Sequence, residues 1–119
     1  MKKFIWLFGE NLGNTYNNNS YYFWDEVCNV KDEINKYFIL SRNKQNLDFY
    51  KTLPQDKQDK IVWKNSLKHM ELFKKADMYF VTLSYRDILP EEILGKPINN
   101  KKTINIFTTW NTRNKKNRV

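Results

Sequence analysis

The first strongly patterned segment of the chain is an unbroken apolar run, Phe4–Phe8, which ends at Gly9. The run shows no alternation of polar and apolar residues, and this is typical of a strand covered on both faces, as in a parallel sheet. It is much shorter than the ~20 apolar residues that a transmembrane helix needs. A polar loop follows, after which Asn19 or Ser20 can cap a helix. Open α/β sheets begin in this way, and they bind ligands at the carboxyl ends of their strands.

The rest of the chain alternates short apolar segments with helical patterns. The first helix is expected to end at 35–36, and its predicted buried face consists of Phe23, Val27, Val30 and Ile34, widened by Trp24 and Cys28. The other predicted elements are strands at 37–40, 61–63, 78–81 and 103–107 and helices at 44–60, broken at Pro54, and at 66–76. This alternation predicts an α/β fold: a Rossmann-like parallel sheet of about five strands with helices on both faces.

Length and charge set the broad class of the chain. Its 119 residues suffice for one domain, expected at 1–110. A hydrophobic content of 40% and an aromatic content of 16% argue against a disordered chain. The net charge of +8 predicts attraction to polyanions, including an anionic membrane surface. Residues 111–119 are basic, and we expect them to form a solvated, disordered tail.

Cysteine and histidine are too few for most metal or nucleophilic sites. The single cysteine, Cys28, excludes an internal disulfide and is expected to be a buried, inert thiol. The single histidine, His69, lies beside the predicted apolar stripe of Leu67, Met70 and Phe73 without joining it, so we expect it to face solvent. No acidic or histidine cluster has metal-ligand spacing, and neither a metal nor a cofactor is predicted.

The loop after the first strand is the candidate binding segment. Its pattern, Gly9-x-x-x-Gly13, lacks the dinucleotide-binding spacing and the P-loop lysine. A plain connecting loop and a loop that cradles a ligand fit this spacing equally well. Glu10 has the chemistry of a base or a hydroxyl-binding carboxylate, although a lone loop glutamate is usually solvated.

The aromatic residues fit a core better than a nucleic-acid platform. Interleaved aromatic and basic residues are typical of single-strand binding, but most of these aromatics fall on predicted core faces. No RNA-binding signature is present, so no specific nucleic acid is predicted. The residues concerned are Tyr21, Tyr22, Trp24, Trp63 and Trp110.

Several motifs together are similar to those of one known family. The most distinctive is Trp6-Leu7-Phe8-Gly9-Glu10-x-x-Gly13 followed by Asn19-Ser20-Tyr21-Tyr22-Phe23; the looser ones are Lys64-Asn65-Ser66, Lys75-Ala76-Asp77, Tyr79-Phe80-Val81-Thr82 and Lys102-Thr103-Ile104-Asn105. In these motifs the chain resembles the CDP-glycerol glycerophosphotransferases, which are the polymerases of teichoic acid and capsule. The resemblance implies the amino-terminal half of a GT-B-like unit, in which two Rossmann-like domains face each other across a cleft.

The resemblance breaks down at the family's catalytic motif. Asn111 follows Trp110 where the family has the histidine that acts as general base. Asparagine has no basic lone pair near neutral pH and cannot accept that proton. No catalytic residue is therefore predicted, and the domain that holds the CDP-linked donor in such enzymes is absent from this sequence. We expect a truncated or fragmentary transferase domain without activity of its own.

The functional expectation is the acceptor side of this transfer reaction, in cell-surface polymer synthesis. The implied partners are a polymer or lipid-linked acceptor and a CDP-glycerol-type donor, the latter only through a second domain. The implied location is cytoplasmic, peripheral at the inner face of the cell membrane. The alternatives are a small, basic, non-enzymatic module that binds an anionic polymer or membrane surface, and a half-enzyme that docks onto a separate donor domain. The predicted substrate-binding residues are Gly9, Glu10, Asn11, Gly13, Asn19 and Ser20.

Overall fold

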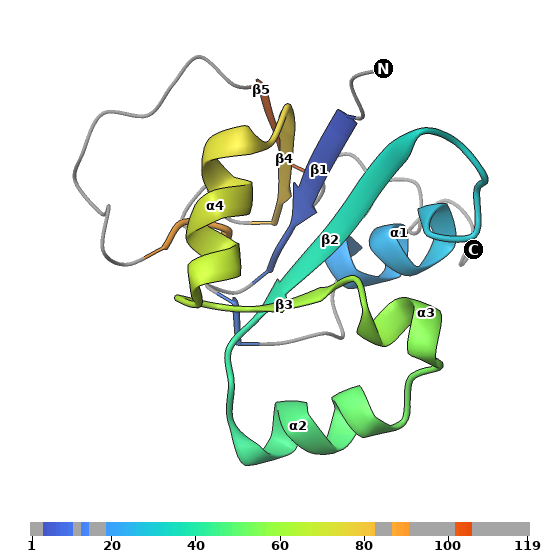
Figure 1. Cartoon of the computed structure of the whole chain (residues 1–119), viewed down its shortest axis with the longest axis vertical. Helices are drawn as coiled ribbons and strands as arrows, with labels where there is room; N and C mark the ends of the chain where they lie inside the picture. Colours follow the sequence, from blue (N-terminus) through green and yellow to red (C-terminus); the bar gives the residue numbers. More distant parts are fainter. Residues whose placement is uncertain (1–3, 11–12, 15–18, 83–86, 91–101, 106–119) are drawn as a thin grey trace, which may run out of the picture.

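A central parallel sheet with helices on both faces organises the structure, a computed structural model (Figure 1). It describes residues 4–10, 13–14, 19–82, 87–90 and 102–105, and for residues 19 and 102–105 it describes the backbone. The elements in chain order are β1 (Phe4–Phe8), α1 (Asn19–Val27), β2 (Ile34–Leu40), α2 (Lys44–Lys51), α3 (Gln55–Gln58), β3 (Ile61–Trp63), α4 (Leu67–Lys75), β4 (Met78–Val81) and β5 (Lys102–Asn105).

The strand order is β3-β2-β1-β4, all parallel, with β5 next to β4. The first apolar run is thus a central strand, as predicted: Phe8 of β1 pairs with Phe38 of β2 on one side and with Phe80 of β4 on the other. An all-parallel sheet of this order with interleaved helices is Rossmann-like. The predicted fold class is confirmed at this level.

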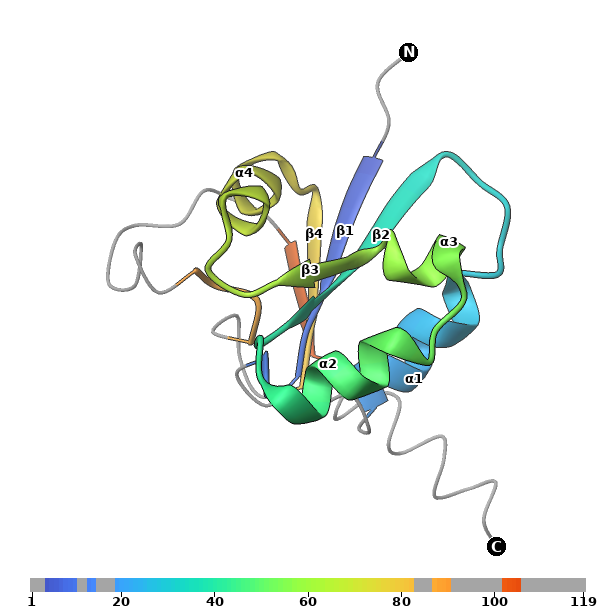
Figure 2. The same cartoon turned by 60° about the horizontal axis from the view of Figure 1, so that its bottom comes forward.

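Successive side chains along the strands pack into two separate hydrophobic cores, one on each face of the sheet. Leu7, Ile39 and Tyr79 pack in the core on the α4 side, whereas Phe8, Phe38 and Phe80 belong to the core on the α1 side. Figure 2 shows the sheet nearly edge-on, with α4 on one side and α1, α2 and α3 on the other. Side chains point alternately to opposite faces of a strand, and both faces here are covered. This explains why β1, β3 and β4 are continuous apolar runs.

The predicted aromatic core is partly confirmed. Tyr21 and Trp24 of α1 are buried, and the indole Nε1 of Trp24 donates to the Lys36 carbonyl oxygen at 3.0 Å. Trp63 is half-buried. Tyr22, however, is 53% exposed and is not part of the core. Trp110 lies outside the described residues.

The prediction that the first helix continues to Ile34 is wrong. α1 ends at Val27, Val30 is 56% exposed, and Ile34 begins β2, where it pairs with Phe4. The cause is Lys36, whose ammonium donates to the carbonyl oxygens of Val27 and Val30 at 3.1 and 3.4 Å. These bonds satisfy carbonyl groups that a longer helix would have used.

The later elements agree with the predicted ranges. Residues 44–60 form two short helices, α2 and α3, separated at Pro54. The Ser66 hydroxyl caps α4 by accepting a hydrogen bond from the His69 amide at 3.1 Å. β5 spans Lys102–Asn105 and overlaps the predicted strand at 103–107 over 103–105; residues 106–107 and the tail at 111–119 lie outside the described residues. Within the described part of the chain, no helix has the length and apolar character needed to cross a bilayer.

Candidate functional site

The strand order reverses between β1 and β4, because the chain proceeds from β1 toward β2 and β3 and then returns to β1's other side. Open parallel sheets bind ligands at the carboxyl ends of the strands beside such a reversal. In this chain Gly9 and Glu10 follow β1 at that point, and Thr82 follows β4. The Gly9 amide donates to the Phe80 carbonyl oxygen at 3.0 Å, which holds the start of the loop against β4.

Gly9 is required by close packing. A Cβ atom at this position would lie 2.5 Å from the Asp87 carbonyl oxygen and 2.7 Å from Cγ2 of Ile88. The segment 87–88 therefore crosses the end of β1 at a distance that only glycine permits. The loop glycine that was predicted to bind substrate has a structural role here, and its contact with a ligand stays a prediction.

Glu10 is fully buried, so the expectation that it is solvated was wrong. Its Oε2 atom accepts a hydrogen bond from the Tyr21 amide at 3.0 Å, in the first turn of α1. The neighbouring Ser20 is also fully buried, and its hydroxyl oxygen lies 3.4 Å from the Phe80 carbonyl oxygen, to which it donates. Two of the predicted site residues, Glu10 and Ser20, thus form hydrogen bonds that connect the loop to α1 and α1 to β4.

Gly13 closes the loop as a tight turn. Its φ angle of +90° is one that side-chain-bearing residues rarely adopt. The Gly13 amide donates to the Glu10 carbonyl oxygen at 2.7 Å, and its own carbonyl accepts from the Ser41 amide at 2.6 Å. The loop after β1 is thereby attached to the end of β2. Asn46, which the sequence did not single out, is buried and donates from Nδ2 to the Ser41 carbonyl oxygen at 2.7 Å.

Asp87 and Thr82 form a second buried polar pair at the same edge. One carboxylate oxygen of Asp87 accepts from the Thr82 amide at 2.9 Å and from its hydroxyl at 3.2 Å. Both side chains are buried. Sequence reasoning treated Asp87 only as part of a loop. The available signal was an aspartate placed shortly after a buried strand, where its carboxylate can bind free amide groups.

His69 is fully buried, which contradicts its expected exposure. Nε2 lies 2.6 Å from the Ile88 carbonyl oxygen, and Nδ1 accepts from the Asn65 amide at 2.9 Å. Burial lowers the His69 pKa to about 4, so the ring is neutral and carries its proton on Nε2. The buried face of α4 is His69, Leu72 and Phe73. Of the predicted stripe only Phe73 is buried; Met70 is half-buried and Leu67 is exposed.

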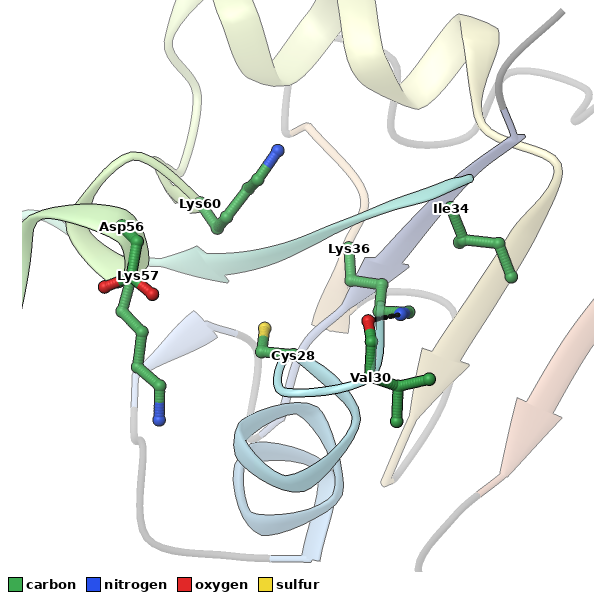
Figure 3. A pocket seen from close by; sticks show the side chains of 7 residues that line it. All are labelled: Cys28, Val30, Ile34, Lys36, Asp56, Lys57 and Lys60. Atoms are coloured by element: carbon green, nitrogen blue, oxygen red, sulfur yellow. Dashed lines mark hydrogen bonds between the residues drawn. The ribbon is translucent and has the colours of Figure 1, made fainter. Parts of the chain in front are cut away.

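A small pocket lies at the opposite edge of the sheet, near the beginning of β2 (Figure 3). Its volume is about 140 Å³, and its lining residues are Cys28, Val30, Ile34, Lys36, Asp56, Lys57 and Lys60. Figure 3 shows the Lys57 and Lys60 ammonium groups pointing to opposite sides and Lys36 turned toward Val30. Lys57 pairs with Asp25, and Lys60 donates to the Asn35 amide oxygen at 3.2 Å. The ammonium groups of these lysines therefore bind acceptors of the chain itself.

Cys28 in this pocket is not an activated thiol. It is half-buried, and burial raises its pKa to about 11. The nearby Lys57 and Lys36 oppose this shift without cancelling it. Because the thiolate is the reactive form, the thiol is unreactive near neutral pH. This agrees with the predicted inertness, although the side chain is less buried than expected.

Some predicted site residues cannot be placed. Asn11 and Asn111 lie outside the described residues, and Asn19 is placed only as the first residue of α1. The structure does bring Gly9, Glu10 and Ser20 together around one end of β1. Among the described side chains, no group of three or more His, Cys, Asp or Glu residues is arranged to hold a metal ion.

Comparisons with protein-family models, with curated proteins and with solved structures found no match to this chain. The functional interpretation therefore rests on the geometry of the switch point and on the motif resemblance.

Proposed function

We propose that this chain forms the acceptor-side α/β domain of a CDP-glycerol-type glycerophosphotransferase, the amino-terminal half of a GT-B-like unit. The observation that supports this proposal is the position in the fold of the motif that begins at Trp6. Trp6, Leu7 and Phe8 lie in the central strand β1, and Gly9 and Glu10 leave the sheet at the point where the strand order reverses. In open α/β sheets this is the position that contacts ligands.

The proposed chemistry needs two opposed surfaces. Transfer of glycerol phosphate from CDP-glycerol requires an acceptor hydroxyl on one side and donor phosphates held on the other, aligned across a cleft. The loop from Gly9 to Gly13 and the start of α1 at Asn19–Ser20 form the acceptor wall in this proposal. The acceptor is a polymer end or a lipid-linked sugar, presented at the inner face of the membrane.

This chain is expected to have no transferase activity, because Asn111 stands at the position of the family's histidine and cannot act as the base. The purified chain, incubated with CDP-glycerol and a lipid-linked acceptor, should release no CMP. Clear turnover would contradict the assignment of the base.

Ligand contact is tested separately by amide NMR. A soluble acceptor analogue should shift the amide signals of Gly9, Gly13 and Ser20, whereas CDP-glycerol should leave them unchanged. The signal of Val30, at the opposite edge of the sheet, is the internal control. Shifts caused by CDP-glycerol and not by the acceptor would reverse the proposed orientation of the domain.

A second candidate function is a basic module that binds an anionic polymer or membrane surface. The outer side of α4 favours it, since Lys68, Lys74 and Lys75 are exposed there and Glu71 is its one acidic residue. Binding to phosphatidylglycerol vesicles should fall steeply with salt and should persist in Glu10→Ala and Asn19→Ala variants. Lys68→Glu with Lys74→Glu should weaken it more than a control at the exposed Lys31. Equal effects would exclude α4 as the binding surface.

A further inference from the structure

The first turn of α1 has the features of an anion-binding site. A helix begins with unpaired amide groups and a partial positive charge. In Rossmann-type domains the helix after the first strand uses these groups to bind phosphate. α1 is the helix after β1, and it begins at the same edge of the sheet as the end of that strand.

An anion already occupies this position, and it belongs to the chain. Oε2 of Glu10 accepts the hydrogen bond of the Tyr21 amide at 3.0 Å, and the Glu10 side chain is fully buried. Carboxylates are stabilised at helix N-termini by the same interactions that stabilise phosphate. The neighbouring hydroxyl of Ser20 is directed to the Phe80 carbonyl oxygen of β4.

The backbone of Glu10 is held in place by hydrogen bonds, and this keeps its side chain beside the first turn of α1. The Glu10 carbonyl oxygen accepts from the Gly13 amide at 2.7 Å, and Gly13 is in turn bonded to Ser41 at the end of β2. On the other side, Gly9 is confined between Phe80 and the segment 87–88. Asp87, adjacent to Gly9, places a second buried carboxylate at this edge.

We propose that the Glu10 carboxylate is a built-in substitute for a bound phosphate and closes the N-terminus of α1 to phosphate and nucleotide ligands. A ligand that placed a phosphate at this edge would meet a like charge in the same place. The inference goes beyond the proposed function and stands without it, since it concerns any phosphate-bearing ligand at the end of β1.

The test removes the carboxylate and asks whether an anion takes its place. Glu10→Ala is compared with Glu26→Ala, which removes the same charge from an exposed position on the same helix. Thermal unfolding is followed while pyrophosphate is titrated at constant ionic strength. We expect a saturable increase of Tm in Glu10→Ala, with an apparent Kd lower by at least about tenfold than in the parent protein and in Glu26→Ala.

Either of two results would overturn the proposal. One is saturable stabilisation of the parent protein by pyrophosphate that Glu10→Ala loses. The other is an equal response of the Glu10 and Glu26 variants, which would mean that only net charge matters. If Glu10→Ala does not fold, Glu10→Gln replaces it, since the amide keeps the volume and an acceptor oxygen while removing the charge. The same gain in pyrophosphate affinity is expected there, and its absence counts against the proposal.

Discussion

At the scale of single residues, hydrogen-bond partners determine which polar side chains can be buried. His69 occupies a core position of α4 because Asn65 donates to one ring nitrogen and Ile88 accepts from the other. A buried polar group is tolerated when its hydrogen bonds are made. The sequence shows neither partner, so a lone histidine beside an apolar stripe was assigned to solvent. Glu10 was misjudged for the same reason, since its partner at Tyr21 follows only after the loop.

His69 makes stability depend on pH. Its pKa is lowered to about 4 in the folded protein and is about 6.5 in an unfolded chain. Between these two pH values the unfolded state binds more protons than the folded state. The contribution of His69 to the free energy of unfolding is therefore fully present above pH 6.5 and is lost as the pH falls toward 4. Urea unfolding at pH 7 and 4.5 should show a loss for the parent protein that exceeds the loss for His69→Gln by roughly 2 kcal/mol. Parallel losses would show that the imidazole does not titrate in this way.

Gly9→Ala is expected to destabilise the protein by about 1–3 kcal/mol, because the added Cβ would overlap the Asp87 carbonyl oxygen and Ile88. The free energy of unfolding from urea titration measures the effect. Ile88→Ala is destabilising by itself, because Ile88 is fully buried. Combined with Gly9→Ala it should cost less than the sum of the two single changes, since it removes one of the two clashes and leaves the contact with the Asp87 backbone. A Gly9→Ala protein as stable as its parent would mean that the segment 87–88 moves away at little cost.

At the scale of elements, most strands and the later helices were predictable, and the end of α1 was not. β1, β3 and β4 are continuous apolar runs, and so is the second half of β2 from Tyr37 to Leu40, because both faces of the sheet are covered. The end of α1 depends instead on Lys36, a residue of the next strand that reaches back to the helix. Periodicity continued through Val30 and Ile34, and it carried no information about this contact.

Lys36→Met tests that contact. The substitution removes the donor to the carbonyl oxygens of Val27 and Val30 and to Asp32, and Lys36 is only 4% exposed. We expect a loss of about 1–3 kcal/mol in the free energy of unfolding. Lys75→Met is the matched control, since Lys75 pairs with Glu71 at the same spacing but in solvent. It should cost at most about 0.5 kcal/mol. Equal costs would make the helix-end contact unimportant.

At the scale of the whole molecule, hydrophobic pattern predicted a parallel α/β layer but not the order of its strands. The order places β1 between β2 and β4, and this creates the switch point at Gly9 and Glu10. Strand length gave one hint, because β3 has only three residues and lies at an edge of the described sheet. The candidate site was located from one loop, and the residues that complete it come from β4 and the segment 87–90.

Native-state hydrogen exchange tests this arrangement directly. The Gly9 amide, bonded to Phe80 between two central strands, should exchange only when the whole domain unfolds. The Lys64 amide is bonded to Leu40 at the end of the edge strand β3 and should exchange by local opening. Low concentrations of denaturant should therefore accelerate exchange at Gly9 and leave Lys64 nearly unchanged. Faster exchange at Gly9 than at Lys64 would contradict a central β1, and with it the switch point on which both proposals depend.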